Sequence, residues 1–268
     1  MVRVAVVNEL HMDVWGDGVP ALFVHSSFGW GLETFPEQLA LADQCQVVLI
    51  DRCGFGGSAS LEAEGWPVDM HDVAALLDGV GPAHVVGQSS GAVVVLLAAG
   101  LRPERVRSLV AIEPPAFEVA RGDADADATT TSLKPVFDRA HTLTAEEFVA
   151  DWARANGMPE ERLATWIEGF GDQEWAAAEA SRRERWPGDA PIQFDVLAAA
   201  AFPKVLVRGG WKPEVVGRDG AGRNYAAVCR AICDRIGGRL VVFERSSHNP
   251  QLQEPQAFNR LLREVWRQ

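Results

Sequence analysis

The stretch HVVGQSSGAVVVLLAA, residues 84–99, decides the fold of this chain. An apolar run at 84–86 predicts a buried strand, and the apolar residues after Gly91 predict a buried helix. Between them, Gly87-Gln-Ser-Ser-Gly91 fits the G-x-S-x-G pattern of a nucleophile elbow, in which a strained turn holds the serine hydroxyl clear of the backbone. A Cβ atom at either glycine would collide with the neighbouring strand or helix. The stretch therefore predicts Ser89 as a nucleophile.

Short apolar runs recur on both sides of this stretch, and most of them are continuous rather than alternating. Continuous runs are typical of strands that helices cover on both faces. The runs lie at 2–7, 11–15, 21–24, 47–50, 84–86, 106–112, 204–207 and 240–243. Helical patterns of crossover length separate the later runs. The sequence therefore predicts an α/β fold with a mostly parallel, eight-stranded sheet, whose first two runs are close enough to pair antiparallel at one edge.

The strand pattern stops between residues 113 and 191. Residues 121–131 are polar and predict a solvated loop, whereas Thr144-Ala-Glu-Glu147 forms a capping box that opens the first of three expected helices. We interpret residues 116–190 as a helical lid, inserted between the sixth and seventh predicted strands of a single domain of residues 1–268.

This predicted lid is acidic and rich in tryptophan. It carries 16 acidic and 8 basic side chains, so 16 − 8 = 8 of the 12 net negative charges lie here. Its tryptophans either pack the lid onto the sheet or face a pocket beneath it. They are Trp152, Trp166, Trp175 and Trp186.

The charge of the chain excludes several classes of partner. Its 268 residues carry 25 basic and 37 acidic side chains, a net charge of −12, which repels phosphate backbones and anionic lipid heads. No apolar run approaches the roughly 18 residues of a membrane-spanning helix, and the first residues turn polar too soon for a signal peptide. We therefore expect a cytoplasmic protein that binds neither nucleic acid nor membranes. The sequence does not decide the oligomeric state of the protein, and a homodimer is one possibility.

Two patterns bear on metals and cofactors. Cys229 and Cys233 are spaced to share one helix face, but no further Cys or His lies within twelve residues to complete a zinc site. Gly54-Phe-Gly-Gly-Ser-Ala59 fits the dinucleotide fingerprint, but Glu64-Gly-Trp-Pro67 interrupts the long helix that the fingerprint requires. The sequence therefore predicts no metal and no organic cofactor.

A serine hydroxyl needs a base and a site for the oxyanion before it can act as a nucleophile. His248 lies in Ser246-Ser-His-Asn-Pro250, just after the last predicted strand. The carboxyl ends of parallel strands are where an open α/β sheet gathers its site residues. His25 also follows a predicted strand, and it is interpreted as a second base or as a structural residue of its loop. We expect His248 to be the base.

The order of elbow serine, acid and late histidine resembles the α/β-hydrolase family, and the resemblance covers nearly the whole chain. Asp51-Arg-Cys-Gly-Phe-Gly-Gly-Ser58 looks like the turn after the fourth strand of this family. His25-Ser-Ser-Phe-Gly29 occupies the place of the family's His-Gly oxyanion loop, with Ser26 in place of the usual glycine. The resemblance implies that the backbone N–H groups of Ser27 and Ser90 hold the oxyanion.

The position of the acid that would pair with the histidine differs from the commonest pattern of the family, in which an aspartate follows the seventh strand. Lys212 stands near that position here, followed by Glu214. Glu113 ends the strand at 106–112, and Pro114 favours an extended backbone at Glu113, so that its carboxylate projects from the strand end. Fungal lactonases of this family that open the macrolide ring of zearalenone similarly use a glutamate at the end of strand six. We expect Glu113 as the acid, with Glu214 as the alternative and a structural Glu113 as the third case.

These features predict a serine hydrolase that cleaves a carboxylic ester or lactone of a medium-sized apolar or aromatic molecule through an acyl-enzyme. The same residues would serve a carbon–carbon hydrolase or an acyl transferase. A receptor-like protein that keeps the fold and binds a ligand without turnover is the alternative of another class. Candidate pocket residues are His25, Phe28, Trp152, Trp186 and Trp211.

Overall fold

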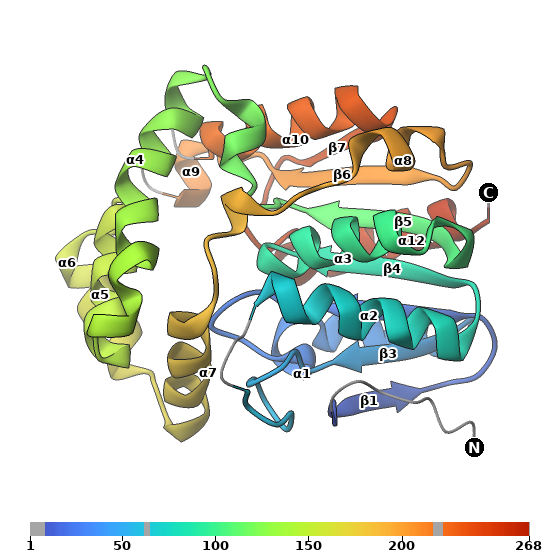
Figure 1. Ribbon diagram of the computed structural model, residues 1–268, viewed down its shortest axis with the longest axis horizontal. Coiled ribbons are helices and arrows are strands. Elements are labelled where there is room, and N and C mark those ends of the chain that lie inside the picture. The colour runs from blue at the N-terminus through green and yellow to red at the C-terminus, as the bar shows by residue number, and fades with distance from the viewer. Residues whose placement is uncertain (1–8, 62–64, 217–221, 268) are drawn as a thin grey trace.

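A computed structural model describes residues 9–61, 65–216 and 222–267 of the chain (Figure 1). Within these residues seven strands form one sheet, in the order β1-β3-β2-β4-β5-β6-β7. The strands are β1 (Met12–Trp15), β2 (Pro20–Val24), β3 (Gln46–Ile50), β4 (Ala83–Gln88), β5 (Val106–Ile112), β6 (Lys204–Gly209) and β7 (Arg239–Phe243). The predicted first strand at 2–7 lies outside the described residues, so its pairing with the next run stays a prediction.

The sheet is mostly parallel, as predicted. Edge strand β1 runs antiparallel to β3, with Met12 opposite Ile50, and every other neighbouring pair of described strands is parallel. In Figure 1 the parallel strands all run toward the end of the molecule where α4, α5, α6 and α7 lie. The carboxyl ends of the strands therefore meet beneath these helices.

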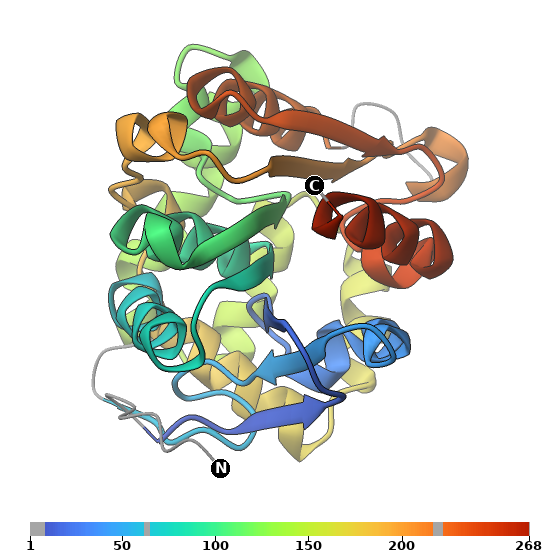
Figure 2. The ribbon, with the colours of Figure 1, turned by 90° about the vertical axis from the view of Figure 1, so that its right-hand side faces the viewer.

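Helices cover both faces of the sheet, because successive strand side chains point to opposite faces and both sets are apolar. Leu22 and Val24 belong to one core cluster, whereas Ala21 and Phe23 belong to the other. The first cluster packs under α2, α3, α8 and α10, and the second under α12 and the short helix η1 (Figures 1 and 2). The α-helices are α1 (Gly31–Thr34), α2 (Trp66–Val80), α3 (Ser90–Leu101), α4 (Ala124–Arg139), α5 (Ala145–Ala155), α6 (Glu160–Glu168), α7 (Asp172–Arg183), α8 (Phe194–Ala199), α9 (Pro213–Val216), α10 (Arg223–Ile236), α11 (Pro250–Gln253) and α12 (Pro255–Trp266). The 3₁₀-helices are η1 (Pro36–Leu41), η2 (Pro103–Arg105), η3 (Phe117–Ala120), η4 (Ala140–Thr142) and η5 (Pro187–Asp189).

The turn between β4 and α3 is strained, as the sequence predicts. Ser89 has φ 54° and ψ −121°, a conformation that non-glycine residues rarely adopt. A Cβ atom on Gly91 would overlap the carbonyl oxygens of Val24 and His25, and one on Gly87 would overlap the carbonyl oxygen of Gly91. The two glycines therefore let strand and helix approach closely enough to hold Ser89 at the tip of the turn.

Replacing Gly91 by alanine is expected to destabilise the protein by about 3 kcal/mol, because the new methyl group must displace backbone atoms at the end of β2. Chemical denaturation measures this loss. Gly100→Ala is the matched control in the same helix, since the atoms nearest to its Cβ all belong to the Gln193 side chain, the closest at 3.3 Å, and none is a backbone atom. Equal stability of the two variants would contradict the close-approach argument.

The connection between β5 and β6 is helical over residues 117–189. The solvated loop predicted for 121–131 is wrong, because α4 begins at Ala124. The Asp123 carboxylate accepts hydrogen bonds from the backbone N–H groups of Asp125 and Ala126, which stabilises the helix start. The buried side chains of α4 are few and small near this end, so the helix has little of the apolar periodicity that would reveal it in the sequence. The capping box at Thr144 is confirmed at the start of α5.

Candidate active site

Ser89 and His248 line one cavity of about 240 Å³ at the carboxyl ends of the parallel strands. Ser89 stands at the N-terminus of α3, and His248 lies in the loop between β7 and α11. The His248 Nδ1 atom is 2.6 Å from Oε2 of Glu113, a side chain that is fully buried. Among the described residues, the Ser89 hydroxyl makes no hydrogen bond, to His248 or to any other group. The fold thus brings the three predicted catalytic residues to one place, with the histidine already oriented by the acid.

The Glu113 carboxylate has two further donors, one from the last residue of β6 and one from the turn that follows. Its Oε1 atom accepts hydrogen bonds from the backbone N–H of Gly209, at 2.8 Å, and from the indole Nε1–H of Trp211, at 2.7 Å. Trp211 was predicted as a pocket residue, but it does not line the cavity and instead fixes the acid. The lone pairs of one carboxylate oxygen are therefore occupied, and the other oxygen faces His248.

The backbone of Glu113 differs from the sequence-based expectation. The residue before a proline usually adopts an extended conformation, yet Glu113 has φ 44°, in the left-handed region. Its N–H still donates to the Val207 carbonyl of β6, at 2.9 Å. The three hydrogen bonds at the carboxylate and this backbone bond together hold the residue in a conformation that is unfavourable in isolation.

The alternative acid, Glu214, lies on α9 and is exposed to solvent. Lys212, at the place where the family commonly has an aspartate, forms an exposed ion pair with Glu244 at 3.2 Å. In the described residues, neither side chain forms a hydrogen bond or an ion pair with His248. The geometry therefore favours Glu113 over Glu214 as the partner of the histidine.

The backbone N–H groups of Ser27 and Ser90 donate to no acceptor within the described part of the chain. Both residues line the cavity beside Ser89. The Ser90 N–H is one of the first N–H groups of α3, which have no intrahelical partner and carry the positive end of the helix dipole. Two unpaired donors next to a nucleophile can bind an oxygen that becomes negatively charged.

Three of the five predicted pocket residues line the cavity: Phe28, Trp152 and Trp186. His25 does not, because it is completely buried behind the loop, where it acts as a structural residue. The sequence did not reveal three further members of the aromatic wall, which come from helices far apart in the chain. These residues are Phe117, Phe137 and Tyr225, whereas Trp166, one of the four tryptophans considered for the pocket, does line the cavity. Apolar spacing along each helix was their only signal, and it does not separate core positions from pocket positions.

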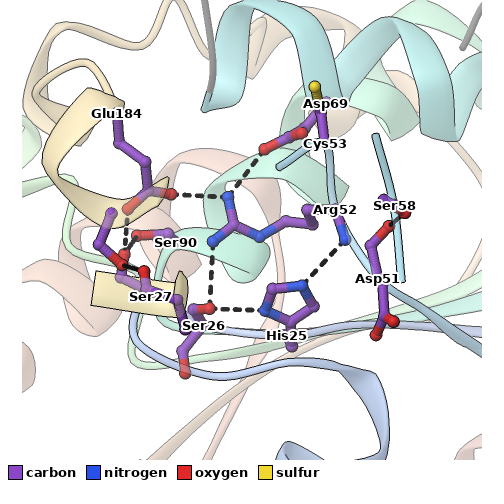
Figure 3. A network of polar contacts seen from close by, with 12 residues as sticks. His25, Ser26, Ser27, Asp51, Arg52, Cys53, Ser58, Asp69, Ser90 and Glu184 are labelled. Atoms are coloured by element: carbon purple, nitrogen blue, oxygen red, sulfur yellow. Dashed lines mark hydrogen bonds and ion pairs between the residues drawn. The ribbon is translucent and has the colours of Figure 1, made fainter. Parts of the chain in front are cut away.

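Behind the loop of residues 25–29, the predicted oxyanion loop, lies a buried charge cluster that the sequence did not reveal (Figure 3). Arg52 Nη1 is 2.8 Å from Asp69 Oδ2 and 2.6 Å from Glu184 Oε1, and all three side chains are almost completely buried. Two carboxylates share one guanidinium, so one negative charge is left without a full counter-charge. Burial raises the pKa of Asp69 from its ordinary 3.8 to about 7, although Arg52 opposes this increase.

Asp69 is therefore expected to make the stability depend on pH. Because its pKa is higher in the folded than in the unfolded chain, the folded state binds more protons between about pH 4 and 7. The unfolding free energy should fall as the pH rises through this range, by roughly 1–3 kcal/mol for this residue. Urea unfolding at pH 5 and pH 8 tests this expectation, with Asp69→Asn as the comparison. A fall of equal size in the wild type and in Asp69→Asn would contradict it.

All four cysteine side chains are buried. Burial raises the pKa of Cys233 to about 11, so this thiol is not reactive at neutral pH. In the residues that the structure describes, no group of three or more His, Cys, Asp or Glu side chains could hold a metal ion. Nor does the described part of the chain contain a helix with the length and apolar character to cross a membrane.

Comparisons with known proteins agree with this architecture. The model of the alpha/beta hydrolase family matches residues 21–261. A putative carbamate hydrolase, RutD, from Azorhizobium caulinodans is 35% identical over 108 residues, which are 39% of this chain and 40% of that protein. The chain thus matches about two fifths of the length of this relative.

Solved structures resemble the chain over nearly its full length. A thermophilic esterase from Thermogutta terrifontis superposes with a TM-score of 0.68 and 20% identity, covering 99% of this chain and 97% of the esterase. The enol-lactonase from Burkholderia xenovorans LB400 superposes with a TM-score of 0.69 and 18% identity, covering 98% of this chain and 99% of the lactonase. At these identities the likeness concerns the fold.

Proposed function

This chain belongs to the alpha/beta hydrolase family, and we propose that it is a serine hydrolase that cleaves small carboxylic esters or lactones through an acyl-enzyme. The observation that carries the proposal is the convergence of Ser89, at the strained elbow, with the His248–Glu113 pair in one cavity. The esterase and the lactonase with the same fold make these substrates the first to test.

In the proposed mechanism, His248 Nε2 takes the proton of the Ser89 hydroxyl while the Ser89 oxygen attacks the carbonyl carbon. The carbonyl π electrons move onto oxygen, and the N–H groups of Ser27 and Ser90 bind that oxyanion. Glu113 keeps the proton of His248 on Nδ1 and stabilises the imidazolium that forms. The imidazolium then protonates the leaving alkoxide, and the C–O bond breaks to give the acyl-enzyme.

Hydrolysis of the acyl-enzyme repeats these steps with water. His248 takes a proton from the water, whose oxygen attacks the acyl carbon, and the same two N–H groups bind the second oxyanion. The proton returns to the Ser89 oxygen as the acid product leaves. No step calls for a metal ion or an organic cofactor.

The cavity indicates a small substrate with an apolar acyl or alcohol group. Its volume of about 240 Å³ lies just below the range of about 300–1,000 Å³ that is typical of pockets for drug-sized ligands. Aromatic rings from the loop after β2, from α5, from α6 and from the segment before η5 form much of its wall. We propose that residues 116–190 act as the lid over this site.

Labelling with a fluorophosphonate, followed by peptide mapping, tests the nucleophile directly. We expect a single adduct on Ser89. A series of p-nitrophenyl esters then tests the substrate: acetate and butyrate should be turned over with higher kcat/KM than decanoate, because a ten-carbon chain exceeds the cavity. Lack of labelling together with lack of turnover of the short esters and of small lactones would refute the proposed activity.

One observation favours the receptor-like alternative, namely the absence of a hydrogen bond between the Ser89 hydroxyl and His248. Catalytic hydrogen bonds are often long or poorly aligned before substrate binds. The two functions differ in their response to Ser89→Ala. Tight binding of a small lactone that this variant leaves unchanged, without turnover by the wild type, would establish a receptor.

A further inference from the structure

The charge cluster behind the oxyanion loop joins three distant parts of the chain. Arg52 follows β3, Asp69 lies in α2, and Glu184 directly follows α7 of the helical segment (Figures 1 and 3). A buried ion pair of this kind adds little net stability, because removing the charges from water offsets most of their attraction. A stability role alone therefore does not account for the cluster, and its contacts with the loop suggest another role.

The first contact concerns the peptide bond between Ser26 and Ser27. The Ser26 carbonyl oxygen lies 3.1 Å from Arg52 Nη2, which donates a hydrogen bond to it. It lies 2.6 Å from His25 Nδ1. His25 Nε2 accepts a hydrogen bond from the Arg52 backbone N–H, at 2.9 Å, so the ring proton is on Nδ1 and is donated to the Ser26 carbonyl. Two donors thus fix the direction of this carbonyl.

The charge state of His25 supports this assignment. Burial, together with the nearby Arg52 guanidinium, holds the pKa of His25 well below its ordinary 6.5. The ring is therefore neutral at physiological pH and keeps one donor and one acceptor nitrogen. His25 acts on the loop through its hydrogen bonds and not as a second base.

Because the Ser26 carbonyl and the Ser27 N–H belong to one planar peptide group, fixing the direction of the carbonyl also fixes the direction of the N–H. The described residues contain no cis peptide bond, and in a trans peptide the C=O and N–H bonds point in opposite directions. With its carbonyl held toward Arg52, the Ser26–Ser27 peptide directs the Ser27 N–H away from the charge cluster. That N–H is the donor that has no acceptor and lies beside Ser89.

The second contact links the two oxyanion donors to each other. The Ser27 hydroxyl donates to Oε2 of Glu184, because the carboxylate paired with Arg52 can only accept. The Ser90 hydroxyl therefore donates to Ser27 Oγ, at 2.7 Å. This chain of hydrogen bonds ends on a charged group, which strengthens it. It fixes the separation of Ser27 and Ser90, the two residues that supply the N–H groups of the proposed oxyanion site.

Both contacts involve Glu184, which directly follows α7 and takes part in the first through its ion pair with Arg52. The helix itself offers Ser181, whose Oγ accepts a hydrogen bond from the Phe28 backbone N–H at 2.8 Å. Phe28 has φ 62°, so this bond helps to hold an unfavourable backbone conformation. The oxyanion loop is thus attached at two points to the helical segment that covers the site.

We propose that Glu184 and Arg52 are positioning residues that hold the Ser27 and Ser90 N–H groups in the geometry that binds the oxyanion, and that Glu184 makes this geometry depend on the helical segment. The inference rests on the proposed function. It assigns to a residue of the lid a part in stabilising the transition state, in addition to covering the substrate.

Glu184→Gln tests the proposal, because it keeps the shape of the side chain and removes its charge. We expect kcat for a short ester to fall by about 10- to 100-fold with KM changed less than about twofold, since the donors act mainly in the transition state. The affinity for a trifluoromethyl ketone, which forms a tetrahedral adduct with the serine, should fall by the same factor. Glu179→Gln is the matched control: Glu179 lies in α7, the helix that ends just before Glu184, but it forms an ion pair with Arg182 near the surface, and this variant should keep wild-type kcat.

Ser27→Ala supplies the second variant. It removes the hydroxyl that links Glu184 to Ser90 but keeps the backbone N–H, and we expect a loss of kcat of about tenfold. If Glu184 acts through this hydroxyl, the double variant should lose little more than the larger single loss. Full kcat in Ser27→Ala, or in folded Glu184→Gln, would overturn the inference while leaving the proposed function in place. Absence of any turnover by the wild type would overturn both.

Discussion

Replacement of Ser89 by alanine is expected to lower kcat/KM for short esters by at least about 10⁴-fold. The change removes the only atom that can form the acyl-enzyme in the proposed mechanism, and it leaves the base, the acid and both oxyanion donors in place. The residual rate should come from water attack assisted by the oxyanion site. Stopped-flow or steady-state assays with p-nitrophenyl acetate measure the loss.

Two further measurements make this test specific. The melting temperature of Ser89→Ala should stay close to that of the wild type, because alanine fills the same space at the elbow and the Ser89 hydroxyl has no hydrogen bond to lose. Ser132→Ala, on the exposed face of α4, serves as the control serine and should retain full activity. Retention of more than about a tenth of the wild-type rate by Ser89→Ala would show that another residue is the nucleophile.

The elbow could be predicted from the sequence because its determinants are local. A buried strand, two glycines at fixed spacing and a buried helix all lie within residues 84–99, and the atoms that exclude a Cβ at the glycines come from the same motif and the adjacent strand. The contact between His248 and Glu113 spans 135 positions in sequence. It was still predictable, because Glu113 directly follows β5 and His248 lies in the loop after β7, and the carboxyl ends of parallel strands meet at one edge of the sheet.

The contacts of Arg52 and Glu184 with the oxyanion loop could not be predicted from strand ends. Arg52 and Glu184 are 132 positions apart, and Glu184 follows a helix, not a strand. Nothing in the local pattern places the end of α7 against the turn after β3, since that contact depends on how the whole helical segment packs. The role of Trp211 was missed for a related reason: an aromatic residue after a strand is as suitable for a pocket wall as for a hydrogen bond to an acid.

Substitution of Glu113 by glutamine is expected to lower kcat by about 10³- to 10⁴-fold, nearly as much as the loss of the nucleophile. The reason lies in the number of acceptors. The carboxylate accepts three hydrogen bonds: two at Oε1, from Gly209 and Trp211, and one at Oε2, from His248. An amide has one acceptor oxygen and one donor nitrogen, so it cannot replace all three.

The most favourable arrangement of the glutamine places its oxygen against Gly209 and Trp211, and its NH₂ group then faces Nδ1 of His248. Nδ1 must become the acceptor, which moves the ring proton to Nε2, the nitrogen that should take the proton of Ser89. The variant would therefore be folded but would hold the histidine in the wrong tautomer. Nitrogen NMR of the His248 ring distinguishes the two tautomers, and steady-state assays give the loss of kcat. Glu214→Gln alters an exposed carboxylate on α9 and should change kcat by less than twofold; a loss confined to that variant would assign the acid to Glu214.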